Sequence, residues 1–148
     1  MAVTETREVV IAATPDEILD VLFDLESFPE WSSTHKKVEI LERDDQGRPS
    51  KSRQVVKVVG ITDVQVLAHS LHDDGVSWEL VSSRQQRAQT GRYTLTPDGD
   101  STRVGFELMV DPTVPLPGFL VRKGANSVMD ALTKGLRKRV LEVKRSGD

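Results

Sequence analysis

Residues 119–144, FLVRKGANSVMDALTKGLRKRVLEVK, are the stretch that decides the fold of this chain of 148 residues. The stretch has no proline, and its apolar residues recur every three or four positions, as Val121, Ala125, Val128, Leu132, Leu136, Val140 and Val143. This spacing is typical of a helix with one apolar stripe, which here would be about 39 Å long. Gly124 and Gly135 interrupt the stripe, and each costs about 1 kcal/mol relative to alanine.

The chain before this stretch supplies strands. Seven runs rich in β-branched residues read as strands: 5–13, 36–44, 51–59, 61–71, 76–83, 87–96 and 102–110. Short turns connect the last six runs, which predicts an antiparallel meander. Between the first two runs, Thr14-Pro15-Asp16-Glu17 has the pattern of a helix start with a capping box. Phe28-Pro29-Glu30-Trp31 predicts a second short helical turn, with Trp31 either as a packing residue or at the entrance of a cavity.

A single helix with an apolar stripe must bury that stripe, and the sheet is its only large partner. We therefore expect one α+β domain over residues 1–148. Its curved seven-stranded antiparallel sheet would wrap around the long C-terminal helix, with two short helices after the first strand. Because one helix rarely fills the mouth of a bent sheet, a hollow can remain between the two layers.

Composition excludes several classes of function. Lys and Arg total 20 against 23 Asp and Glu, a net charge of −3 that argues against DNA binding. Without cysteine, the chain cannot form disulfides, thiolate metal sites or a Cys nucleophile. No apolar run has the length of about 18 residues that a membrane span needs. Because the N-terminus, MAVTETREVV, also lacks the apolar run of a signal peptide, we expect a cytoplasmic protein.

The last segment is basic although the chain as a whole is acidic. Between Arg122 and Arg145, eight basic residues face only Asp130 and Glu142. One interpretation is a solvated helix face. The other is a contact surface around Arg137-Lys138-Arg139 for an acidic partner, ribosomal RNA or a membrane. Nothing in the sequence indicates an oligomeric state.

Three motifs carry a resemblance to a known family: IAATPDEI (11–18), DLESFPEW (24–31) and TRVGFELMVDPTVPLPGFL (102–120). With the order of the elements, they make the chain similar to the START/birch-pollen-allergen-like superfamily, in particular its bacterial polyketide cyclase/dehydrase and lipid-transport group. The resemblance implies a helix-grip fold with an apolar cavity between sheet and helix. Members of the superfamily include lipid carriers, hormone receptors, aromatase/cyclases and quinone-binding proteins, so the fold does not select one activity.

Strand alternation predicts which side chains face such a cavity. The expected ligand, without a cofactor or metal, is a small hydrophobic molecule of lipid, fatty acyl, polyketide or quinone type. The candidate ligand-binding residues are Val56, Val58, Trp78, Leu80, Tyr93, Phe106, Leu108, Phe119, Met129 and Leu132. A cyclase or dehydratase using the same cavity is the alternative, and an interaction protein acting through the basic helix is a third hypothesis.

With the inner faces assigned in this way, the histidines are not expected to form a metal or catalytic site. His69 and His72 have HxxH spacing, but residues three apart on a strand point to opposite faces, so we predict no metal site. Asp63, Gln65 and His69 share one face of their strand, and Val64, Val66 and Ala68 share the other, which is taken as the inner face. If these faces are reversed, His69 enters the cavity and becomes the candidate for acid–base catalysis. His35 follows Trp31 in a turn and is expected to be exposed.

Overall fold

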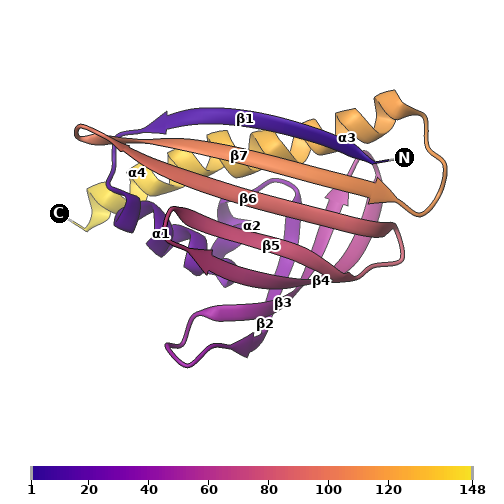
Figure 1. The fold of residues 1–148 in the computed structure, drawn as a ribbon, viewed down its shortest axis with the longest axis horizontal. Coiled ribbons are helices and arrows are strands. Elements are labelled where there is room, and N and C mark those ends of the chain that lie inside the picture. Colours follow the sequence, from indigo (N-terminus) through magenta and orange to yellow (C-terminus); the bar gives the residue numbers. More distant parts are fainter. Residues whose placement is uncertain (1, 148) are drawn as a thin grey trace.

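The computed structural model describes residues 2–147, and Figure 1 shows a sheet with a long helix along one side. In that range the elements are β1 (Val3–Ile11), α1 (Pro15–Phe23), a 3-10 turn (Leu25–Ser27), α2 (Phe28–Trp31), β2 (His35–Arg43), β3 (Pro49–Val58), β4 (Ile61–His72), β5 (Gly75–Ser82), β6 (Gln86–Asp98), β7 (Ser101–Pro112), α3 (Gly118–Asp130) and α4 (Leu136–Ser146). A π-helical turn (Ala131–Gly135) joins α3 to α4, so residues 118–146 form one continuous helix. The predicted bounds of the strands and of the long helix lie within two residues of these.

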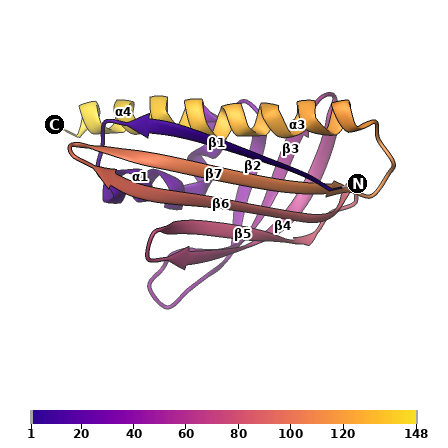
Figure 2. The same ribbon diagram turned by 45° about the horizontal axis from the view of Figure 1, so that its top comes forward.

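The seven strands form one antiparallel sheet in the order β1-β7-β6-β5-β4-β3-β2. Only the pairing of β1 with β7 departs from sequence order, and it brings the N-terminal strand beside the last one. The long helix packs along the sheet near β1 and β7 (Figure 2). This arrangement confirms the predicted α+β helix-grip fold.

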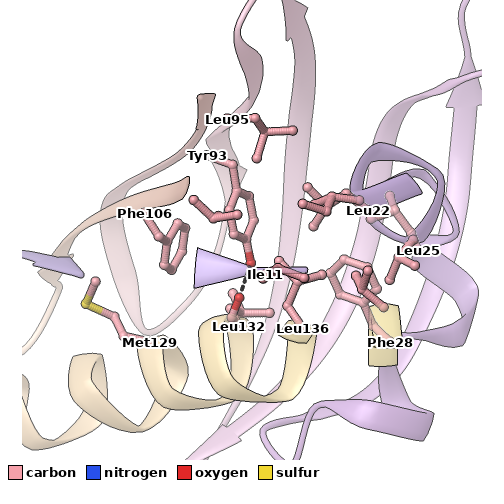
Figure 3. Close-up of a cluster of buried hydrophobic side chains, with 14 of the residues drawn as sticks. Ile11, Leu22, Leu25, Phe28, Tyr93, Leu95, Phe106, Met129, Leu132 and Leu136 are labelled. Atoms are coloured by element: carbon pink, nitrogen blue, oxygen red, sulfur yellow. Dashed lines mark hydrogen bonds between the residues drawn. The ribbon is translucent and has the colours of Figure 1, made fainter. Parts of the chain in front are cut away.

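The short helices α1 and α2 cover one end of the space between sheet and helix (Figure 1). The predicted capping box is present, because the Thr14 hydroxyl accepts from the Glu17 amide at 3.2 Å and the Glu17 carboxylate accepts from the Thr14 amide at 2.9 Å. Leu22 of α1 and Phe28 of α2 are buried with Ile11 and Leu136 in the main core (Figure 3). These side chains therefore fill most of the space at this end of the molecule.

The π-helical turn lies where the helix meets the middle of the sheet. The Tyr93 hydroxyl on β6 donates to the Leu132 carbonyl at 2.6 Å (Figure 3), and the Thr133 hydroxyl donates to the Met129 carbonyl at 2.6 Å. On the other side of the turn, a Cβ on Gly135 would lie 2.8 Å from the Trp31 carbonyl oxygen. Inserted hydroxyls of this kind are a known cause of irregular helix turns.

Candidate functional site

Two neighbouring hollows lie between the sheet and the long helix. The larger, about 140 Å³, opens where the β3–β4 turn, the β7–α3 loop and the first turns of α3 meet. The smaller, about 60 Å³, lies toward α1 and the β2–β3 turn. Both are lined by five residues that separate them and that we call the waist: His35, Gln54, Leu67, Trp78 and Leu132.

The sizes of the side chains on the helix explain the position of the larger hollow. The first half of the apolar stripe presents Val121, Gly124 and Ala125, which are small, and all three line the larger hollow. The second half presents larger residues, of which Met129 and Leu136 are completely buried. Because the sheet curves around both halves, the half with small side chains leaves the larger space, and the other half leaves only the smaller hollow beside Leu132.

A chain of hydrogen bonds runs along the sheet wall of the larger hollow. The Trp78 indole donates to Gln89 at 2.9 Å, and Gln89 donates to Gln65 and to Gln86 at 2.9 Å each. Gln86 in turn donates to the Asp63 carboxylate at 2.9 Å, which also accepts from Ser83 at 2.7 Å. These bonds hold polar side chains in fixed orientations against an otherwise apolar space.

A second group of polar residues lies at the waist and in the adjoining smaller hollow. The His69 Nε2 atom is 2.7 Å from the Ser52 hydroxyl, to which Gln54 donates at 3.0 Å. The His35 Nδ1 atom is 2.7 Å from the Ser32 hydroxyl. Burial lowers the pKa of His35 to about 4, although a hydrogen bond with Gln54 acts in the opposite direction. Burial also lowers the pKa of His69 to about 4, so both imidazoles are neutral near pH 7.

The hollows thus offer neutral hydrogen-bonding groups rather than cations. Among the described residues that line them, Arg48 is the only arginine or lysine, and it bonds to Asp44 at 3.1 Å near the β2–β3 turn. A carboxylate or phosphate inside would therefore find no unpaired positive charge, and burying such a group unpaired is costly. Hydroxyl and carbonyl groups match the glutamine and histidine side chains.

The structure brings six of the ten predicted ligand residues to these hollows. Val56, Val58 and Leu108 line the larger hollow and Tyr93 the smaller, while Trp78 and Leu132 line both. The other four line neither: Phe106 and Met129 are buried in the core, Leu80 is half-buried on β5, and Phe119 is 69% exposed at the start of α3. Trp31 also lies outside the hollows and packs on Phe28, with ring centroids 4.7 Å apart.

The expected orientation of β4 was wrong. Asp63, Gln65 and Leu67 point inward, whereas Val64 is 52% exposed on the outer face. The rule that apolar residues face inward failed here because the inner face of β4 is lined by polar side chains. The signal that could have corrected it is the two-residue turn at Val59-Gly60, since this turn sets the register that pairs Gln54 with Gln65.

The positions of His69 and His35 also differ from those expected. His69 shares the inner face of β4 and lines the smaller hollow. His35, expected to be exposed, is only 6% exposed because it begins β2 opposite Val56 instead of lying in a turn. Sequence analysis therefore missed His35, Gln65 and Gln89 as cavity groups.

Metal and membrane signals are both missing from residues 2–147. No group of three or more histidine and acidic residues in this range is placed to hold a metal ion. None of the helices in this range combines the length and the apolar character that crossing a membrane requires.

An antiparallel sheet that grips a C-terminal helix, with space left between them, defines a protein of the helix-grip class. Residues 2–141 match the family model described as polyketide cyclase / dehydrase and lipid transport, so the chain belongs to that family. No curated protein matches the chain.

Solved structures agree with this assignment. A START superfamily protein from Mycobacterium smegmatis is 30% identical, with a TM-score of 0.87 over 95% of this chain and 98% of the other. A protein from Thermus thermophilus is 23% identical, with a TM-score of 0.80 over 95% and 99%. The Zhui aromatase/cyclase from a Streptomyces species is 16% identical, with a TM-score of 0.77 over 95% and 94%. The last two similarities concern the fold alone.

Proposed function

We propose that the chain binds a small, uncharged, mainly apolar molecule in the hollows between sheet and helix. The observation that carries this proposal is a space lined by aliphatic side chains and by fixed neutral polar groups, whose one cation among the described lining residues, Arg48, is already paired with Asp44. The apolar contacts would come from Val56, Leu108 and Leu132, and Trp78 would contact the ligand at the waist. The polar contacts would come from Gln54 and the glutamines of the larger hollow.

Burial of apolar surface would supply most of the affinity. At about 25 cal/mol per Å², covering roughly 200 Å² of ligand contributes on the order of 5 kcal/mol before the cost of ordering is subtracted. The polar groups would then select ligands by their oxygen functions. Within the range expected from the sequence, this favours polyketide and quinone types over fatty acids that would bury their carboxylate inside the hollows.

Catalysis in the same space is the second candidate. Its supporting observation is the contact of 2.7 Å between His69 and Ser52, since a neutral imidazole beside a hydroxyl is suited to move a proton. A cyclase or dehydratase would use His69 as its base. His69→Ala should then abolish turnover of a polyketide-type substrate, whereas a binding protein should keep most of its ligand affinity.

Native mass spectrometry of protein purified from its own host tests the proposal. The wild-type chain should carry a non-covalent small molecule that denaturation releases. Val56→Trp should remove this molecule by filling the larger hollow. Val64→Trp is the matched control, because this residue lies on the outer face of the adjacent strand and is 52% exposed. A wild-type chain without ligand, or equal occupancy in both variants, would contradict the proposal.

A further inference from the structure

The mouth of the larger hollow has an unusual surface. Three segments surround it, residues 57–62, 83–87 and 112–124, and we call them together the rim. Val59, Ile61 and Val114 both line the hollow and are exposed, by 42%, 37% and 48%. Phe119, on the first turn of α3, is 69% exposed beside Leu120, which also lines the hollow. Four apolar side chains from two of these segments thus face solvent around one opening.

Val59 has a backbone conformation that its side chain disfavours. Its φ is 45°, in the left-handed region, and it is the only residue other than glycine with positive φ among residues 2–147. It forms the tight β3–β4 turn with Gly60, whose φ is 80°. Asparagine suits such a position, whereas a β-branched residue there is strained. A strained, exposed valine at a turn therefore points to a role outside folding.

The rim is also strongly basic. It contains Lys57, Arg84, Arg87, Arg122 and Lys123 and no acidic residue, so the rest of the chain has 15 basic against 23 acidic residues. Arg87 lies 3.5 Å from the Asp111 carboxylate at its border. The other four form no ion pair with any of the residues that the structure describes. Apolar and unpaired basic side chains are therefore combined at one end of the molecule.

At the other end of the long helix some basic residues are paired with acidic ones, whereas Arg137, Lys138 and Arg145 form no ion pair with any residue that the structure describes. Arg139 lies 3.4 Å from Glu30, and Lys144 lies 3.7 Å from Glu17. The turns at that end carry Asp44, Asp73 and Asp98, among other acidic residues. The molecule is thus polarised along its length, which would turn the rim toward an anionic surface during approach.

We propose that the rim docks onto the surface of an anionic lipid bilayer, with Val59 and Phe119 inserted among the lipids and the basic residues close to the phosphates. The hollow would then open directly toward the membrane. This step rests on the proposed function, because docking places the mouth where an apolar ligand could pass without crossing water. This surface differs from the one expected from the sequence, which lay around Arg137-Lys138-Arg139 at the other end of the helix.

Charge and shape favour a bilayer over other occupants. A second copy placed rim to rim would bring five basic residues against five identical ones, which is unfavourable. A folded acidic protein would dock its apolar side chains into a groove on this surface. Val59, Val114 and Phe119 instead project outward from separate segments. A lipid surface satisfies both features, since its headgroups attract the basic residues and its acyl boundary accepts isolated apolar side chains.

Co-sedimentation with vesicles tests the docking. The purified chain should bind vesicles of phosphatidylglycerol and phosphatidylcholine and bind vesicles of phosphatidylcholine alone much more weakly, and salt should reduce the binding. Because each basic residue near an anionic surface contributes about fivefold, Arg122→Gln with Lys123→Gln should weaken binding by about 30-fold. Arg137→Gln with Lys138→Gln, the same change at the far end of the helix, should leave binding unchanged.

Val59→Asn separates docking from folding. Asparagine should relieve the strained turn and raise the melting temperature, while the loss of an inserted apolar group should weaken vesicle binding several-fold. Val10→Asn, which removes a 49% exposed valine from the outer face of β1, is its matched control and should not affect binding. A merely structural role for Val59 predicts the same binding by the variant and the wild type.

Three results would overturn the docking. The first is that the chain binds neither kind of vesicle. The second is that the rim and far-end variants lose vesicle binding equally. The third is that the wild type sediments as a dimer that Phe119→Ser converts to a monomer. If vesicle binding fails while a small molecule still co-purifies, docking is wrong and the proposed function stands. If vesicles bind but the hollow is always empty, the proposed function is wrong.

Discussion

The two ends of the sheet–helix space are built from one apolar stripe but differ in what fills them. Toward α4, the large residues Met129 and Leu136 pack with Leu22 and the other buried side chains from α1 and α2. Toward the start of α3, small residues meet glutamines on the sheet, and no short helix covers the opening. The periodicity of the stripe thus predicts burial along the whole helix, while side-chain size decides where the buried space stays empty.

This difference also separates stability from function along the molecule. Closer packing at the α1 end leaves only the smaller hollow of about 60 Å³ and supplies much of the hydrophobic free energy of folding. The open end contributes less to stability, and its polar groups are satisfied by one another, from Trp78 to Asp63. Substitutions should therefore have different effects at the two ends, and four tests follow in order of expected size.

Truncation of Leu136 should give the largest effect. This side chain is completely buried at the packed end, so Leu136→Ala should lower the free energy of unfolding by about 3–4 kcal/mol through lost burial and a new cavity. Leu120→Ala is the matched change at the open end, where the side chain is half-buried beside existing space. It should cost less than about 1 kcal/mol in the same urea titration. Equal costs would show that both ends are packed alike.

Acidification should destabilise the fold through His35 at the waist and His69 in the smaller hollow. Burial lowers the pKa of both His35 and His69 from 6.5 to about 4, so between these values the unfolded chain binds protons that the folded chain does not. Stability is therefore fully present above the unfolded value and falls as the pH falls through this window, by at most about 3 kcal/mol for each histidine.

Single variants separate these histidines from the carboxylates that also titrate. His35→Gln and His69→Gln should each make the loss of stability with falling pH less steep, as measured by urea unfolding across the window. His72→Gln is the control, since this histidine bonds to Ser77 and lines neither hollow. If all three variants follow the wild-type slope, the buried neutral histidines do not govern the acid response.

Much of the fold could be predicted from local patterns, and less of the site. The capping box at Thr14, the helical stripe and the turns between strands are local signals, and each was confirmed in the structure. His35 and Gln65 could not be placed by asking whether a residue is polar, because both point into the interior of a sheet whose inner face is partly polar. Their positions depend on register, which joins residues distant in sequence.

A substitution at Gly91 tests what fixes the Trp78 side chain at the waist. A Cβ at this position would lie 2.2 Å from a ring atom of Trp78, so Gly91→Ala should displace the indole from Gln89. We expect a loss of about 2 kcal/mol in stability and a change in tryptophan fluorescence. Gly105→Ala, on the neighbouring strand, would meet only the Thr94 carbonyl at 3.9 Å. It should leave the fluorescence unchanged, and a similar change in both variants would contradict this role of Gly91.

The two glycines of the long helix give the smallest and most direct comparison of its ends. Alanine gains about 1 kcal/mol of helix propensity at either position. At Gly135 the new Cβ would lie 2.8 Å from the Trp31 carbonyl oxygen, a backbone atom that cannot move freely, so Gly135→Ala should destabilise the chain by about 1 kcal/mol net. At Gly124 the nearest atom is a Val58 methyl at 3.3 Å, next to the hollow. Because this methyl has room to move, Gly124→Ala should leave stability unchanged or raise it by up to about 1 kcal/mol in thermal unfolding. It should also narrow the mouth and reduce the co-purifying ligand, and destabilisation by Gly124→Ala as large as that by Gly135→Ala would mean that the open end has no spare volume.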